Sequence, residues 1–223
     1  MSDQKYVTES RQVEGYNQVI LRSIGQVFIQ QGEQEGLTVE AEKDLMPNIV
    51  TVVENEALIM DIGRGWYDRL LFGLKLSPVK HLRYIVQVKQ LRVITLAGAG
   101  TIEVGELAAD RLAIDITGQG QVKIASLAAV GLTATMSGQG TIQLAGQAGD
   151  QTIRLNGMGT YDGLELEGKT GQATITGNGT IKLAVEDTLQ ISITGMGTVE
   201  YRGSPKVTQR ITGLGAVRQV SAD

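Results

Sequence analysis

Three aspartates in the second half of the chain are the side chains best suited to carry out chemistry. Asp110, Asp150 and Asp187 follow the first glycine of a Gly-x-Gly triplet by 12, 12 and 10 residues. Carboxylates that converge can act as general acid and base or can hold Ca²⁺, as in lyases and hydrolases of pectin-like polysaccharides. These three do not all fall on successive repeats, and no column of arginines accompanies them. Turn residues that hydrogen-bond their own backbone explain them better than catalysis does.

The other residues that could bind a metal or a cofactor stand isolated. His81 has no second histidine or cysteine nearby in the sequence, and a single imidazole rarely makes a metal site. The Gly-x-Gly triplets lack the third glycine and the following helix of a dinucleotide-binding fingerprint. They also lack the aspartate that calcium-binding β-rolls place inside the glycine-rich turn. We therefore expect no cofactor, no metal and no enzymatic activity.

The Gly-x-Gly triplet itself is the dominant pattern, because it recurs seven times at steps of 20, 20, 19, 20, 18 and 18 residues. A fixed period near 20 is typical of a solenoid, in which each coil buries its apolar face by stacking on the next. The repeated glycines are Gly98, Gly100, Gly118, Gly120, Gly138, Gly140, Gly157, Gly159, Gly177, Gly179, Gly195, Gly197, Gly213 and Gly215. We interpret them as structural corners, where a Cβ would collide with the coil above or below.

Three columns of the aligned repeats agree with one stacking register. The positions two before the first glycine and two after the second are apolar in every copy, whereas the residues flanking the triplet are small or polar. A further outward column reads Glu103, Lys123, Gln143, Asp162, Lys182, Glu200 and Arg218. Every pair of charged neighbours in this column has opposite sign, which favours stacking at about 4.8 Å. The sequence predicts an all-β fold, a right-handed parallel β-helix (solenoid) of about 18–20 residues per coil.

The rest of the chain divides around this repeat. We expect a polar tail over 1–12, an N-terminal β region over 13–83 that caps the solenoid, the β-helix over 84–218 and a tail over 219–223. Short strands are expected in the cap at Val19–Arg22, Gln26–Gln30, Leu37–Ala41, Ile49–Val53 and Ala57–Ile62, with a helical turn near Lys43–Pro47. The few residues beyond Gly215 are too short for a second large cap, so the C-terminal end is a candidate self-association surface.

An apolar insertion at 64–78 interrupts the cap and holds the main aromatic cluster. Its candidate interaction patch consists of Trp66, Tyr67, Leu70, Phe72 and Leu74. One interpretation is a plug for the open end of the rod. The other is a patch that contacts a partner, a glycan or a second copy.

Composition limits the partners and the location. The net charge is −4, and residues 1–91 and 92–223 each hold 10 basic and 12 acidic side chains, so no basic tract suits nucleic acid. The longest apolar stretch, Trp66 to Leu76, is too short to cross a bilayer, so no transmembrane segment is expected. The first residues have no apolar h-region, so either the protein is cytoplasmic or its leader is absent from this chain.

The ordered repeat resembles the putative auto-transporter adhesin, head GIN domain family of bacterial envelope proteins. Three further stretches are similar to that family, namely Val13–Ile20, Leu91–Gly100 and Val199–Val207, and the likeness runs from about residue 13 to 218. The resemblance implies a right-handed β-helix, export to the cell envelope and an adhesion role, with no catalytic residues to carry over. This chain departs from the family in the Trp66–Leu76 insertion and in the absence of a visible leader.

Three functions follow from these observations. The first is a non-enzymatic structural or adhesin-like module of the cell envelope that presents a polar ladder to a surface protein or glycan. The second is a self-assembling subunit of an oligomer or filament, and the third is a polysaccharide lyase or hydrolase. The repeat and the resemblance favour the first.

Overall fold

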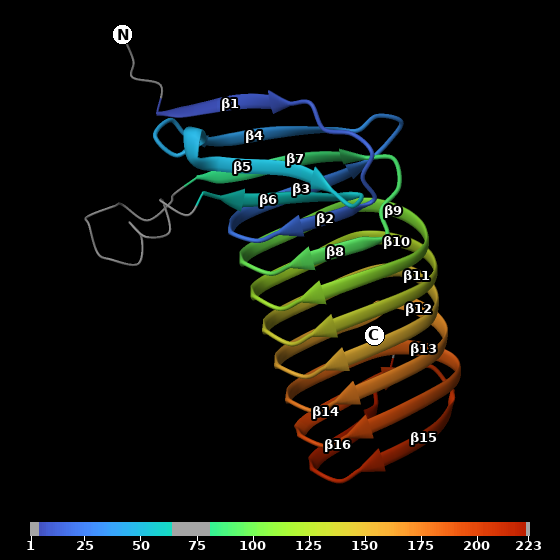
Figure 1. The fold of residues 1–223 in the computed structure, drawn as a ribbon. Helices are drawn as coiled ribbons and strands as arrows, with labels where there is room; N and C mark the ends of the chain where they lie inside the picture. The colour runs from blue at the N-terminus through green and yellow to red at the C-terminus, as the bar shows by residue number, and fades with distance from the viewer. Residues whose placement is uncertain (1–4, 64–80, 222–223) are drawn as a thin grey trace.

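The computed structural model describes residues 5–63 and 81–221, which are built almost entirely of β-strands (Figure 1). One 3₁₀ turn, η1, covers Met46–Asn48, where the sequence predicts a helical turn. The strands are β1 (Tyr6–Arg11), β2 (Gln18–Leu21), β3 (Ile24–Gln31), β4 (Gly36–Glu42), β5 (Ile49–Glu54), β6 (Ala57–Ile62), β7 (Leu82–Val88), β8 (Val93–Leu96), β9 (Ala99–Ile116), β10 (Gln119–Met136), β11 (Gln139–Leu155), β12 (Met158–Ile175), β13 (Asn178–Ile193), β14 (Met196–Arg202), β15 (Lys206–Ile211) and β16 (Leu214–Gln219).

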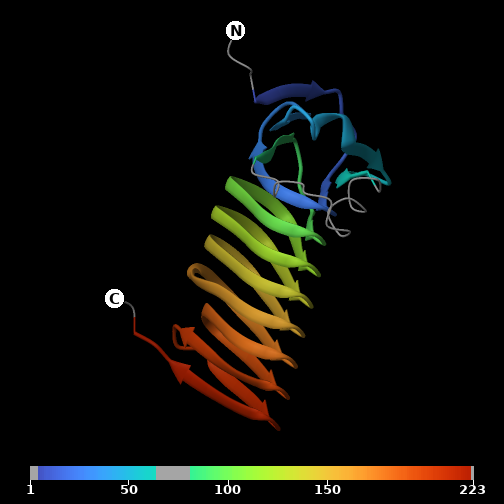
Figure 2. The same ribbon diagram turned by 90° about the vertical axis from the view of Figure 1, so that its left-hand side faces the viewer.

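Strands β9 to β13 each form one coil of a right-handed parallel β-helix, seen side-on in Figures 1 and 2. Each strand pairs in parallel with the strand of the next coil, and β14, β15 and β16 continue the stack. The second glycines lie opposite one another in the order Gly100, Gly120, Gly140, Gly159, Gly179, Gly197 and Gly215. The predicted fold class is therefore confirmed.

The outward charged column also stands in the register that the sequence predicts. Glu103 pairs with Lys123, and the column continues through Gln143, Asp162, Lys182 and Glu200 to Arg218. Lys182 Nζ lies 3.9 Å from Glu200 Oε2. Because this pair is partly exposed, it contributes at most about 1 kcal/mol.

Two columns of apolar side chains beside the glycine corners run the length of the core. The column before each triplet, from Leu96 to Ile193, is at most 1% exposed. The column after each triplet, from Ile102 to Val199, is completely buried. Alternation along each strand places these residues inside and the polar ladder outside.

The Gly-x-Gly corners are tight because the backbones of successive coils touch there. Gln139 N donates to Gly118 O at 2.9 Å, and the same bond recurs from coil to coil. A Cβ on Gly138 would lie against Gly118 O, and a Cβ on Gly140 against Gly120 O, inside the 3.0 Å that real Cβ atoms respect. The obstruction is a main-chain carbonyl, which cannot rotate away as a side chain can.

Each coil turns a second time on the side opposite the glycine corner. We call this turn the second bend; in β9 it covers residues 105–111. Strand register is less regular at the second bend than at the corner. The register shifts between Ile124 and Leu127, between Gln143 and Ala145, and between Gly163 and Glu167. These shifts absorb the difference between coils of 18 and 20 residues. The repeat length is therefore adjusted at the second bend and not at the glycine corner.

One buried polar side chain stabilises the irregular bends. Gln151 is 1% exposed, and its Nε2 donates to Leu166 O at 3.0 Å and to Ala184 O at 3.2 Å. Tyr161, which is completely buried, donates its hydroxyl to Gln151 Oε1 at 3.3 Å. Leu166 falls in the gap of register between β12 and β13, so Gln151 satisfies a carbonyl near a bulge.

The N-terminal strands continue the stack before they close it. Strand β2 pairs in parallel with β8, and β3 pairs in parallel with β9. Strands β6 and β7 add a further layer, again in parallel, on β2 and β3. The direction then reverses, because β5 is antiparallel to β6, β4 is antiparallel to β7, and β1 is antiparallel to β4.

Two of the expected boundaries differ from the structure. The tail expected over 1–12 contains β1, whose alternating residues Val7 and Glu9 pair with Ala41 and Val39 of β4. The β-helix expected from residue 84 already includes β2 and β3, since Ala99 N donates to Ser23 O as later residues donate to a glycine. Serine in place of the first glycine hides this coil from a search for Gly-x-Gly.

Tyr16 joins two strands of the N-terminal layers. It is 3% exposed, its hydroxyl donates to Gln87 O at 2.6 Å, and it accepts from Gly36 N at 3.3 Å. Burial raises the pKa of Tyr16 to about 12, and the nearby Glu35 carboxylate adds to the rise. The apolar patch at Trp66, Tyr67, Leu70, Phe72 and Leu74 lies outside the described residues.

Candidate functional site

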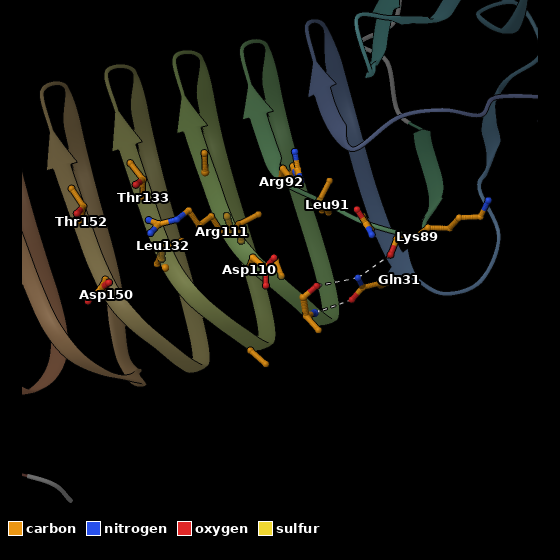
Figure 3. A pocket seen from close by; sticks show the side chains of 17 residues that line it. Gln31, Lys89, Leu91, Arg92, Asp110, Arg111, Leu132, Thr133, Asp150 and Thr152 are labelled. Atoms are coloured by element: carbon orange, nitrogen blue, oxygen red, sulfur yellow. Dashed lines mark hydrogen bonds between the residues drawn. The ribbon is translucent and has the colours of Figure 1, made fainter.

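A groove of about 1060 Å³ runs across the second bends of the first coils (Figure 3). It passes from the end of β3 over β9 and β10 to β11. The polar and charged side chains that line it are Gln31, Lys89, Gln90, Arg92, Asp110, Arg111, Thr133, Asp150 and Thr152. The groove is therefore a polar surface with both signs of charge.

Small residues create the hollow. The columns Ala108–Ala128 and Ala109–Ala129 stand in register at the bend, and Gly131 lies opposite Arg111. Methyl groups and a hydrogen leave the surface low where longer side chains would fill it. Leu91, Leu112 and Leu132 lie beneath this surface and are at most 2% exposed, so they add almost no contact area to it.

The Gln31 side chain closes the end of the groove toward the N-terminus by hydrogen-bonding to the backbone as a strand residue would. Gln31 Oε1 accepts from Ala108 N at 2.8 Å, and its Nε2 donates to Ala108 O at 3.1 Å. The same Nε2 lies 3.1 Å from Lys89 O. The amide thus extends the β3 ladder by one residue and ties the N-terminal layers to the first coil.

Opposite charges flank the centre of the groove. Arg111 and Asp150 both lie opposite Gly131, one coil to each side. The nearest atom to a Cβ placed on Gly131 would be Arg111 Nη1, at 3.3 Å, so the guanidinium lies over the glycine (Figure 3). The Arg111 guanidinium and the Asp150 carboxylate thus lie on either side of Gly131's outer surface, and both can bond to one extended polar ligand.

The groove brings together two of the three aspartates that the sequence singles out. Asp110 and Asp150 line it and Asp187 does not. Asp150 Oδ1 accepts from Thr170 Oγ1 at 2.7 Å, on the side away from Asp110. Two strand spacings and one residue of register separate Asp110 from Asp150, so they do not form a close pair. Over residues 5–63 and 81–221, no cluster of three or more His, Cys, Asp or Glu side chains is placed to hold a metal ion.

His81 lies just before β7, among the N-terminal layers. Its Nε2 is 3.7 Å from Glu40 Oε2, and its ring centroid is 4.7 Å from that of Tyr6. These contacts join β1, β4 and β7. They give His81 a packing role in the N-terminal layers.

Asp115 continues the outward row of the groove along β9. It stands between Thr95 and Thr135 of the neighbouring coils. Partial burial raises the pKa of this carboxyl, and a hydrogen bond from Thr135 opposes the rise. The outer face of the sheet next to the groove is therefore less solvated than an open β surface.

Sequence reasoning missed Gln31, Arg111 and Gly131. None of them belongs to a repeated motif, since Arg111 and Gly131 occupy the same column with unlike side chains. The available signal was the run of alanines at 108–109 and 128–129, which departs from the longer polar residues of later coils. Small residues at matched repeat positions predict a depression in a solenoid surface.

Comparisons with known proteins agree with this architecture. Residues 15–205 match the sequence model of a protein family described as "putative auto-transporter adhesin, head GIN domain". No curated protein matches the chain. Within the described residues, no helix has the length and apolar character needed to cross a membrane.

Several solved structures share the fold over nearly the whole chain. A putative adhesin from Bacteroides fragilis is 22% identical, with a TM-score of 0.89 over 98% of each chain. A putative adhesin from Parabacteroides distasonis is 18% identical, with a TM-score of 0.73 over 98% of each chain. A putative lipid binding protein from the same species is 16% identical, with a TM-score of 0.71 over 98% of each chain. At such identities the likeness concerns the fold alone.

Proposed function

Because the chain belongs to the putative auto-transporter adhesin, head GIN domain family, we propose that it is a non-enzymatic, adhesin-like module of the bacterial cell envelope. Its rigid β-helix holds a polar recognition surface at fixed spacing. The ligand is a protein or glycan of another surface, and the groove over the second bends is where it binds. This location outside the cytoplasm follows the family and is part of the proposal.

The groove is the observation that carries the proposal. Its lining combines Arg92 and Arg111 with Asp110 and Asp150, and the hydrogen-bonding groups of Thr133 and Thr152 lie on the same surface. Such a mixed lining suits recognition of an extended polar chain through charge-assisted hydrogen bonds. The separation of the two carboxylates supports binding over acid–base catalysis, since a catalytic pair must converge on one bond.

A binding screen tests this function. The purified chain is applied to immobilised glycans, matrix proteins and whole cells, and bound protein is quantified. Gly131→Gln would fill the centre of the groove, and Arg111→Ala would remove its central cation. Each is expected to reduce binding at least tenfold while the thermal midpoint changes little.

Gly105→Gln is the matched control, because no atom lies within 4 Å of a Cβ at Gly105 and this residue does not line the groove. It should bind as the unsubstituted chain does. Absence of binding to every probe would contradict the adhesin function, and binding indifferent to Gly131→Gln and Arg111→Ala would contradict the site. Turnover of a pectin-like substrate that disappears in Asp110→Asn or Asp150→Asn would replace the proposal with the enzyme hypothesis.

A further inference from the structure

The two ends of the solenoid differ in charge and match in length, and from this we propose that the chain assembles head to tail with a second copy. The C-terminal edge, formed by the outer sides of β15 and β16, docks on the N-terminal edge, formed by the outer sides of β1 and β5. This assembly is independent of the groove and goes beyond the proposed binding function.

The C-terminal edge is an unpaired end of both faces of the helix. Strand β16 pairs with β14 and β15 pairs with β13, and no other strand of the described residues lies beyond them. Such an edge presents free N–H and C=O groups to any strand that approaches. The chain therefore offers a second copy two strand edges at once.

Apolar surface accompanies these free backbone groups. Ile211 is 38% exposed and Leu214 is 76% exposed, whereas Ile193, the residue equivalent to Ile211 one coil earlier, is fully buried. Val207 and Val217 are only partly buried against the end of the core. Among residues 5–63 and 81–221, the last layer of the core thus lacks the cover that each earlier layer receives from the following coil.

The N-terminal edge has the same two properties. Within the described residues, β1 pairs only with β4 and β5 pairs only with β6, so each has one free side. Tyr6 is 41% exposed on β1, and Val50 and Val52 are 43% and 37% exposed on β5. All four edge strands, β1, β5, β15 and β16, contain six residues.

Strand direction permits continuous pairing across the junction. On one face the order from β1 through β4, β7 and β3 to β9 contains two antiparallel steps, so β1 runs in the same direction as β16. On the other face the single reversal at β5 leaves β5 antiparallel to β15. A head-to-tail junction therefore adds one parallel and one antiparallel ladder, both of which are stable arrangements.

Charge selects this arrangement over contact between like ends. Residues 5–62 hold ten acidic and four basic side chains, whereas residues 196–221 hold one acidic and four basic side chains. The basic residues of the C-terminal end are Arg202, Lys206, Arg210 and Arg218. The one acid, Glu200, faces Lys182. Two C-terminal edges would repel each other, and a C-terminal edge is attracted to the acidic N-terminal end.

The N-terminal charges lie partly on the edge strands themselves. Glu54 ends β5 and Glu9 lies on β1. Arg11 of β1 is turned inward, because its Nη1 donates to Ile49 O and to Thr51 Oγ1, both at 2.9 Å. Arg11 Nε also lies 3.2 Å from Glu9 Oε1, so Glu54 is the acid best placed to meet an incoming basic edge.

Sedimentation velocity over a range of concentrations tests the assembly, with electron microscopy of negatively stained samples. The full chain should form larger species as its concentration rises, and raising the salt from 0.05 M to 0.5 M should reverse this because the attraction is screened. Arg210→Glu and Glu54→Lys should each weaken association at least tenfold. Lys169→Glu, a charge reversal on an exposed side chain in the middle of the stack, should leave it unchanged.

A mixing experiment establishes the polarity of the contact. The Arg210→Glu and Glu54→Lys chains, each impaired alone, should assemble again when mixed, with the two variants alternating, because both kinds of mixed junction then join opposite charges. Since the chain has no cysteine, Thr208→Cys of β15 and Val52→Cys of β5 can be placed on separate copies. A disulfide should join these two variants when mixed, and neither should form one alone.

Monomers at every concentration would overturn the proposal. So would association that Arg210→Glu leaves intact, or a disulfide formed by the Thr208→Cys chain with itself, which indicates contact between like ends. Binding to surface probes by the Arg210→Glu chain reports on the groove separately, so the failure of one proposal is distinguishable from the failure of the other.

Discussion

The glycine corner and the second bend of each coil differ in how strongly they constrain the sequence, although the same strand passes through both. At the glycine corner, seven triplets keep one register without interruption, and main-chain carbonyls of adjacent coils leave no space for a Cβ. At the second bend the register shifts in three consecutive pairings, and the lining varies from alanine to arginine and aspartate. The corner keeps the coils in one register, whereas the second bend varies in register and in sequence, although Gly146 and Gly149 meet main-chain carbonyls there as well.

This division explains where a recognition surface can develop on a solenoid. A change at the corner affects the stacking of every neighbouring coil, because each carbonyl there accepts a bond from the next coil. At the second bend the strands also pair, but exposed side chains such as Arg111 project from the ladder and can change without altering it. Binding residues are therefore expected on the variable edge, which is where the groove lies.

Gly138→Val gives the largest expected difference between the edges. A branched Cβ at this corner would press on Gly118 O and on Thr117 O, the latter only 2.6 Å away. We expect a loss of about 3 kcal/mol in the free energy of unfolding, the upper range for overpacking. Urea unfolding followed by circular dichroism measures it.

Two controls sharpen this prediction. Gln139→Val replaces the exposed residue between the glycines, and Gly105→Val changes an open position at the second bend. Both should stay within about 0.5 kcal/mol of the unsubstituted chain. Equal losses at Gly138 and Gly105 would mean that the two edges are equally constrained.

The contrast between the glycine corner and the second bend also shows which parts of the structure the sequence could predict. The corner was predictable because steric exclusion permits only glycine, and so Gly118 and its equivalents repeat visibly. The groove was not, because Gln31 and Arg111 act through contacts between segments 77 residues apart or between adjacent coils. The coil at Ser23 escaped notice for a related reason, since one substitution removes the motif while the backbone bond persists.

Gln151→Leu tests how much free energy of unfolding the Gln151 hydrogen bonds contribute at the irregular second bends. The substitution leaves Leu166 O, Ala184 O and the Tyr161 hydroxyl without their partner. Buried polar groups left unpaired cost about 1–3 kcal/mol, so we expect a loss of about 2 kcal/mol. Chemical unfolding provides the value.

Two comparisons isolate the hydrogen bonds from the change in volume. Gln147→Leu, at an exposed position of the same strand, should be close to neutral. Tyr161→Phe should lose about 1 kcal/mol, and the double variant should lose less than the two single changes together. Strict additivity would show that Gln151 and Tyr161 do not act as one network.

Tyr16→Phe extends the comparison to the second-bend edge of the N-terminal layers. Loss of the hydroxyl removes the hydrogen bond that it donates to Gln87 O and the one that it accepts from Gly36 N, and we expect a loss of about 1 kcal/mol at pH 7. The folded state holds the proton more tightly, with a pKa of about 12 against 10.0 for an ordinary tyrosine. The stability that Tyr16 adds is therefore present below pH 10 and is lost as the pH rises toward 12.

Unfolding measured at pH 7, 9 and 11 distinguishes this effect of Tyr16 ionisation from a simple packing defect. The difference between the unsubstituted chain and the Tyr16→Phe chain should narrow at pH 11. A difference that is constant with pH would show that ionisation of Tyr16 plays no part.

Asp115→Asn gives the smallest expected effect and concerns the sheet face between the two edges. Partial burial raises the pKa of this carboxyl above 3.8, and the Thr135 hydroxyl compensates in part. A raised pKa means that the folded state prefers the protonated form, so the associated stability is present in acid and is lost as the pH rises through the folded value. The amide has no charge to desolvate, so the variant should be more stable than the unsubstituted chain at pH 7, by no more than about 0.5 kcal/mol, and equal to it near pH 3.

Thr135→Val should enlarge this difference, because it removes the bond that favours the carboxylate. A variant less stable than the unsubstituted chain at pH 7 would show instead that the charge of Asp115 supports the stack, and that the face is as selective in its residues as the glycine corner.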